Sequence, residues 1–180
     1  MSRISLTEYN SASKDVKKEY DYQIDKNGRI TNMKRTLLHS LPSYKAYMEW
    51  YVLKDEIVPF LGERAFTIFS HAISAETDCL ICSTFFRRIL IEWGENPESL
   101  KLNQREQLLV DFGREIVNRS NKVSDSLFVQ LKEVFSEKEI VLLTSFAGIM
   151  IATNLLNNVL KIPLDEYLEP FTKAKGKSHE

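Results

Sequence analysis

The apolar segment from residue 137 to residue 160 is the feature of this sequence that most restricts its fold. Ser136 and Glu139 stand at its start in the S-x-x-E pattern of a helix capping box. Drawn as a helix, the segment is apolar on most of its circumference, and such a helix lies at the centre of a bundle or at a contact between subunits. Its most apolar part, Ile140–Ala152, is shorter than the roughly 18 residues that a membrane span requires. We therefore expect a helical protein that is not embedded in a membrane.

The rest of the chain carries the same helical signals. Apolar residues recur at helical spacing, and capping residues or prolines stand where helices would begin. Only 6 glycines and 5 prolines among 180 residues argue against a sandwich or barrel, which needs many tight turns. The sequence predicts an all-α domain with helices over about 42–59, 63–74, 79–93, 103–117, 124–134 and 137–160, and short helices after Asn96-Pro97 and over 164–171.

The two ends of the chain differ from this helical part. Residues 1–35 are polar, and because Asn27-Gly28 is a favourable type I′ turn we expect an N-terminal arm or a small hairpin. We expect the helical domain to cover 36–171 and a flexible tail to cover 172–180. No apolar stretch of signal-peptide length stands near the N-terminus, so a cytoplasmic protein is expected. The 24 basic and 25 acidic side chains nearly balance, which gives no electrostatic reason to expect nucleic acid as a partner.

The two cysteines of the sequence form one pair, Cys79-x-x-Cys82, at the predicted start of a helix that Thr77 or Asp78 would cap. Residues three apart on a helix share a face, and the free N–H groups of a first turn lower the pKa of a thiol. Such a pair can reduce a peroxide through a sulfenic acid and then close a disulfide. The pair could equally be two buried core residues. A zinc site needs more ligands than this pair and three scattered histidines supply, so we expect no metal and no cofactor.

The surroundings of the pair resemble a known family. Three segments downstream carry this resemblance in their order and spacing: 102–112 (LNQREQLLVDF), 123–140 (with VSD and FSEKEI) and 152–165 (ATNLLNNVL, then IPLD). Over about 42–168 the chain is similar to the alkylhydroperoxidase D-like branch of the carboxymuconolactone decarboxylase family. The resemblance implies a bundle of about seven to nine helices that assembles into dimers, trimers or hexamers. It also implies a thiol peroxidase in which Cys82 attacks the peroxide and Cys79 resolves the intermediate, with a thiol or a protein disulfide reductant that resets the pair. The position of Cys79 at a helix start would instead favour it as the more acidic thiol.

The sequence departs from the family at the two positions that move protons. The peroxidases carry a histidine four residues after the second cysteine and a glutamate about a dozen residues before the first, where this chain has Phe86 and Thr67. His71, one turn after Thr67, and Glu76, three residues before Cys79, are candidate replacements. They could also be an ordinary helical histidine and a solvated carboxylate. We therefore expect weak peroxidase activity.

Two other functions remain open at this point. One is a non-catalytic oligomer or redox sensor, in which oxidation of the pair locks or frees a helix. The other is the decarboxylase chemistry of the family, which acts on a lactone and does not need a CxxC pair. The presence of both cysteines argues against the decarboxylase.

Overall fold

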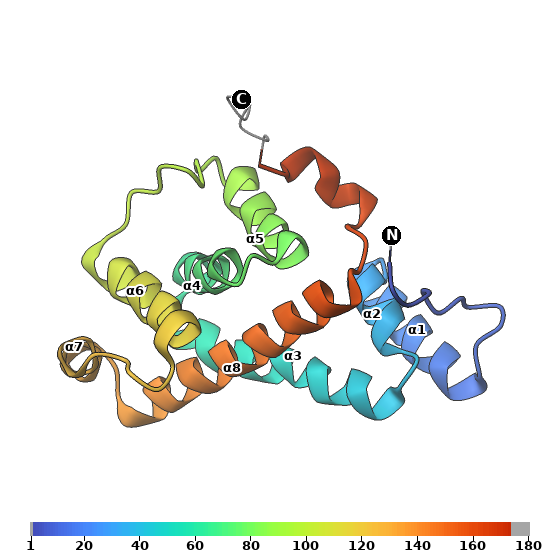
Figure 1. Cartoon of the computed structure of the whole chain (residues 1–180), viewed down its shortest axis with the longest axis horizontal. Coiled ribbons are helices and arrows are strands. Elements are labelled where there is room, and N and C mark those ends of the chain that lie inside the picture. The colour runs from blue at the N-terminus through green and yellow to red at the C-terminus, as the bar shows by residue number, and fades with distance from the viewer. Residues whose placement is uncertain (1, 174–180) are drawn as a thin grey trace.

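The computed structural model describes residues 2–173, and these form helices connected by loops, without strands (Figure 1). The prediction of an all-α chain of about seven to nine helices is confirmed. The elements in chain order are α1 (Lys14–Asn27), α2 (Asn32–Leu37), α3 (Leu41–Leu61), α4 (Glu63–Glu76), α5 (Leu80–Glu92), α6 (Gln104–Arg119), α7 (Asp125–Val134), α8 (Glu137–Leu160) and a final 3-10 helix, η1 (Glu166–Phe171).

Several helices begin where their capping residues predict. Asn103 and Glu106 form a reciprocal capping box at the start of α6, and Ser136 and Glu139 form another at the start of α8. In each, both side chains accept hydrogen bonds from backbone N–H groups that lack a partner within the helix. Ser124 caps α7 in the same way with its hydroxyl. These local signals fix the helix starts independently of the tertiary packing.

The expected hairpin near the N-terminus is wrong. The residues that precede Asn27-Gly28 form α1, and Gly28 ends this helix in the left-handed conformation at φ +69°. Its N–H donates to the carbonyl of Ile24. An Asn-Gly pair suits both a type I′ turn and a left-handed helix end, because both require positive φ. Helix α2 crosses the boundary predicted at residues 35 and 36, and most of the predicted tail, 174–180, lies outside the described residues.

Two predicted details around α5 are also wrong. The N-cap of α5 is Cys79 itself, whereas Asp78 adopts a left-handed conformation at φ +50° in the tight connection from α4. After α5, Asn96-Pro97 does not open a helix. The Asn96 side chain instead accepts the N–H of Glu98 at 3.0 Å, which forms a turn in place of a helix cap.

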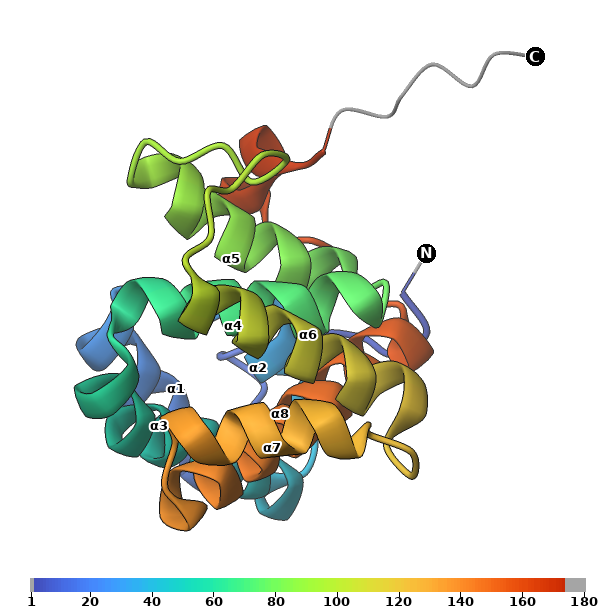
Figure 2. The same ribbon diagram turned by 90° about the vertical axis from the view of Figure 1, so that its left-hand side faces the viewer.

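The main core lies around α4, which packs against α3, α5, α6 and α8 (Figure 2). Phe66 and Phe69 of α4, Phe112 of α6 and Phe146 of α8 are almost completely buried and contact one another. A second apolar cluster joins Cys79 and Cys82 to Ile162 and Leu168 from the C-terminal segment. The start of α5 is therefore fixed by residues that follow α8 in the sequence.

Helix α8 is 24 residues long, and by length and composition it is apolar enough to cross a membrane, with a mean hydropathy of 1.8. This corrects the estimate made from its most apolar part alone. In the structure one face of α8, including Phe146, Ala147 and Met150, packs against α3 and α4 as part of the bundle. Figure 1 shows α8 crossing α3. Its opposite face is not covered by the described residues.

Candidate dithiol site and its cavity

Cys79 and Cys82 are free thiols at the start of α5, and both are buried, with 1% and 8% of their surface exposed. Because Cys79 is the N-cap, its sulfur accepts the backbone N–H of Cys82 at 3.5 Å. A sulfur in this position stands in for the oxygen of an ordinary capping residue. The two thiols are thereby on one turn of the same helix, as the sequence predicts.

Three asparagines of α8 hold this turn in place. The Nδ2 atom of Asn157 lies 3.2 Å from the Cys82 sulfur and 3.7 Å from the Cys79 sulfur. Asn154 donates to the Thr77 hydroxyl at 2.7 Å, and Asn158 donates to the Thr77 carbonyl at 3.0 Å. None of the three was among the site residues predicted from the sequence. Their spacing of three and four residues on a mostly apolar helix is the signal that could have done so.

The pKa values of the two thiols are shifted in opposite directions. The pKa of Cys79 is lowered to about 7, chiefly by a hydrogen bond from the Cys82 thiol and further by the backbone N–H of Cys82 and by Asn157, against the opposing effect of burial. The pKa of Cys82 is raised, because its proton is held by Cys79, because it is buried and because Cys79 carries the negative charge. The pair is therefore best described as a Cys79 thiolate that accepts the proton of Cys82.

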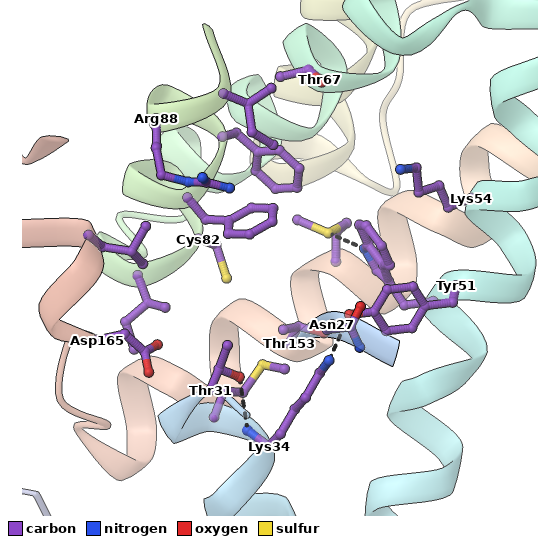
Figure 3. Close-up of a pocket in the computed structure, with 18 of the residues that line it drawn as sticks. Asn27, Thr31, Lys34, Tyr51, Lys54, Thr67, Cys82, Arg88, Thr153 and Asp165 are labelled. Carbon is purple, nitrogen blue, oxygen red and sulfur yellow. Dashed lines mark hydrogen bonds between the residues drawn. The ribbon is translucent and has the colours of Figure 1, made fainter. Parts of the chain in front are cut away.

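Cys82 lines a cavity of about 420 Å³ between α5 and the helices α2, α3, α4 and α8 (Figure 3). Cys79 is not among the residues that line it. Most of the lining is apolar, including Phe85 and Ile89 of α5. A ligand in this cavity would meet the sulfur of Cys82 and not that of Cys79.

The two family relay positions, Thr67 and Phe86, both line this cavity. They are therefore located where a proton relay to Cys82 would act. Neither side chain titrates near neutral pH, so neither can take up or release a proton there. Thr67 and Phe86 thus occupy the positions of the family's proton relay but cannot transfer protons.

Glu76 and His71, the candidate replacements for the proton relay, lie outside the cavity. The carboxylate of Glu76 accepts from the Asn118 side chain at 2.6 Å and lies 3.6 Å from Arg114, so it is directed toward α6. His71 is half-buried on α4, and its pKa is lowered by burial and by Arg87. Within residues 2–173, neither side chain lines the cavity or hydrogen-bonds to a thiol. A role for either in proton transfer stays a prediction.

Two buried charged groups of the cavity wall, Lys34 and Asp165, were not identified from the sequence. The ammonium of Lys34 donates to the Tyr51 hydroxyl at 2.8 Å and to Gln23, and burial lowers its pKa to about 8. Asp165 accepts the N–H of Asn32 at 2.8 Å through one carboxylate oxygen, and burial raises its pKa. Both residues come from segments far from the cysteines in the sequence. In the described part of the chain, no group of three or more His, Cys, Asp or Glu side chains is arranged to hold a metal ion.

The arrangement of the helices, with a CxxC pair opening α5 beside a cavity, defines an alkylhydroperoxidase D-like (AhpD-like) fold. A crystal structure of an AhpD-core, uncharacterised peroxidase-related protein from Ralstonia eutropha JMP134 superposes with a TM-score of 0.77 at 19% identity, over 93% of this chain and 94% of that one. A second, of a peroxidase-related protein from Silicibacter sp. TM1040, gives a TM-score of 0.74 at 14% identity over 93% of each chain. No family model and no curated protein matches the sequence. The resemblance inferred from the sequence motifs is confirmed at the level of the fold.

Proposed function

We propose that this protein is a thiol-dependent antioxidant oxidoreductase of the peroxidase type, with Cys79 and Cys82 as its redox pair. It takes a peroxide as substrate and a thiol or a disulfide-reducing protein as reductant, and it acts in the cytoplasm. The observation that carries the proposal is the difference between the two thiols in position and in acidity. Cys82 lines the cavity, and Cys79, with a pKa of about 7, accepts its proton.

In the proposed reaction Cys79 replaces the missing relay. Cys82 gives its proton to the Cys79 thiolate and attacks one oxygen of the peroxide, so that the O–O bond breaks and a sulfenic acid forms on Cys82. The departing alkoxide takes the proton back from Cys79 and leaves as an alcohol. The Cys79 thiolate then attacks the Cys82 sulfur and expels hydroxide, which closes the disulfide. An external dithiol returns two electrons and restores both thiols.

This reaction is expected to be slow. A thiolate at Cys79 is a base of modest strength, and it must release the proton again before it can act as the resolving nucleophile. In a relay of separate side chains these two tasks do not compete. The absence of proton carriers at Thr67 and Phe86 therefore predicts a weak peroxidase.

One observation favours a second candidate, a redox sensor. The sulfur of Cys79 is itself the cap of α5, and both sulfurs contact Asn157 of α8. A disulfide would remove thiolate character from Cys79 and weaken these hydrogen bonds. Oxidation would then loosen the start of α5 without any turnover.

Peroxide-dependent oxidation of dithiothreitol separates the two candidates. For a peroxidase we expect steady turnover in the wild type and its loss in both Cys82→Ser and Cys79→Ser. Leu80→Ala, an exposed residue of the same turn, serves as the matched control and should retain activity. Full turnover by Cys82→Ser would overturn the proposal. Oxidation of both thiols once, without turnover, would identify the sensor.

We also propose that the chain forms a homo-oligomer, as a dimer, trimer or hexamer. The support is the uncovered face of α8, where a stripe of apolar and small residues, exposed except for the half-buried Ala152, runs along the helix at spacings of four and three. Its members are Val141, Ser145, Gly148, Ala152, Leu155 and Val159. This spacing is the one that brings two helices together over a long contact.

A further inference from the structure

Lys34 is a buried cation that has no acidic partner among residues 2–173. Its side chain lines the cavity, and the residue is 4% exposed. Two other cations of the cavity wall have carboxylates: Lys54 lies 3.5 Å from Glu63, and Arg88 lies 2.9 Å from a glutamate one turn away. A third, Arg29, is an exposed residue whose guanidinium lies over the ring of Tyr167. The ammonium of Lys34 instead donates to two neutral oxygens, on Gln23 and Tyr51. An ammonium has three hydrogens, so one remains without an acceptor in the described residues.

The hydroxyl of Tyr51 is a second hydrogen-bond donor, next to the ammonium of Lys34. Because the Tyr51 oxygen accepts from Lys34, its own hydroxyl hydrogen is directed elsewhere, and no acceptor for it is present within residues 2–173. The two donor atoms are 2.8 Å apart. Two donors at this separation can bind the two oxygens of one carboxylate, or one oxygen jointly.

The position of the ammonium is set by a hydrogen-bond network on its far side. Gln23 donates through its amide nitrogen to the hydroxyl of Tyr44 at 2.7 Å, which turns its amide oxygen toward Lys34. Asn27 donates to the same oxygen at 2.9 Å. These contacts fix Lys34 before any ligand arrives, so binding would require little reorganisation.

The remainder of the cavity suits an apolar body. Aromatic and sulfur-containing side chains make up much of the wall, among them Trp50, Phe66, Phe85, Phe86, Met33 and Met150. Its volume of about 420 Å³ lies in the range of pockets that enclose small organic ligands. Asp165, the other buried charge of the wall, is already bonded to the N-terminus of α2, where the helix dipole favours a carboxylate.

We infer that this cavity binds a small monocarboxylate with an apolar aryl or alkyl body, whose carboxylate lies on Lys34 and Tyr51. One ammonium and one hydroxyl match a single negative charge and not a phosphate, which carries more charge and more acceptor oxygens. The body of the ligand extends along the aromatic wall, in the same space that the Cys82 sulfur enters (Figure 3). Binding in this manner does not require that the thiols turn over.

Trp50 reports directly on occupancy of the cavity. The chain has two tryptophans, and Trp93 is exposed at the end of α5, so a Trp93→Phe variant leaves Trp50 as the only tryptophan. We would titrate this variant, reduced and without peroxide, with 4-ethylbenzoate and with its neutral analogue 4-ethylbenzamide. Saturable change in Trp50 fluorescence is expected for the carboxylate, with binding at least about tenfold tighter than for the amide.

Variants of the two donors complete the test. Lys34→Met and Tyr51→Phe should each weaken binding of 4-ethylbenzoate by about tenfold or more, whereas Lys138→Met, at an exposed position, should not. Tyr51→Phe keeps the ring in place, so it remains informative even if Lys34→Met fails to fold. Equal affinity for 4-ethylbenzoate and 4-ethylbenzamide, unchanged affinity in the folded variants, or no saturable binding of 4-ethylbenzoate would each overturn the inference. Because the readout is binding alone, these outcomes are independent of peroxidase activity.

Discussion

Within the described residues, Asn157 is the one side chain outside the pair that donates hydrogen bonds to both sulfurs. It reaches them from α8, and its own amide oxygen is buried without a hydrogen-bond partner within the described residues. An amide placed in this way donates to a thiolate but cannot take its proton. Its contribution to the site is therefore electrostatic, through stabilisation of the charged form of Cys79.

Replacement of Asn157 by alanine tests this contribution. The variant loses a donor to the Cys79 thiolate, so the lower thiol pKa should rise from about 7 by on the order of one unit. The sign follows from the charge, because a group that loses stabilisation of its anion binds its proton more tightly. The pH dependence of the iodoacetamide reaction measures the midpoint. Asn158→Ala, which loses a bond to the Thr77 carbonyl and none to sulfur, is the matched control. An unchanged midpoint in Asn157→Ala would show that the amide does not stabilise the thiolate.

At the scale of helices, α4 and α6 pack closely against each other at Gly113. A Cβ atom added to Gly113 of α6 would lie 3.1 Å from Ile73 and 3.2 Å from Phe69 of α4. Both neighbours are fully buried, and Phe69 stacks on Phe112, so neither can move aside. Gly148 of α8 is also inside a helix, but a Cβ there would meet nothing within 4 Å.

The same substitution at these two glycines should therefore have opposite effects. Gly148→Ala should raise the free energy of unfolding by about 0.5–1 kcal/mol, because alanine favours the helix and meets open space. Gly113→Ala should lower it by about 1–3 kcal/mol, because overpacking between rigid side chains exceeds the gain in helix propensity. Urea unfolding at low protein concentration measures both. A stabilised Gly113→Ala variant would indicate that α4 and α6 separate easily.

A helix start can be predicted from the sequence where the capping residue and its hydrogen-bond partner lie in the same first turn. The boxes at Asn103 and at Ser136 depend on residues three apart, so the sequence contains the whole interaction. Asn27-Gly28 was misassigned because positive φ at glycine serves a hairpin and a helix end equally. The cap of α5 was misassigned because cysteine is a rare cap, and Cys79 takes the position through the left-handed turn at Asp78.

At the scale of the whole molecule, the sequence could predict the thiol pair but not the cavity. Cys79 and Cys82 are neighbours on one turn, and their chemistry can be inferred from that turn alone. Lys34 and Asp165 come to the same cavity from segments more than a hundred residues apart in the sequence. The packing of α2 and the η1 segment around the start of α5 creates this site, and no local pattern encodes it.

The exposed stripe of α8 is also a property of the whole molecule, since it is what remains uncovered once the bundle has formed. Val141 and Leu155, near its two ends, are 63% and 62% exposed, and such apolar exposure along one helix is characteristic of an interface.

If this face joins copies of the chain, a Val141→Glu/Leu155→Glu double variant should place unpaired charges in the contact and dissociate the oligomer into monomers. Helical content should not change, because neither side chain contributes to the core. Sedimentation velocity measures the mass, and Val52→Glu/Val129→Glu, at similarly exposed apolar positions on α3 and α7, is the matched control. A wild-type protein that is already monomeric, or a double variant that keeps the mass of the oligomer, would exclude α8 as the interface.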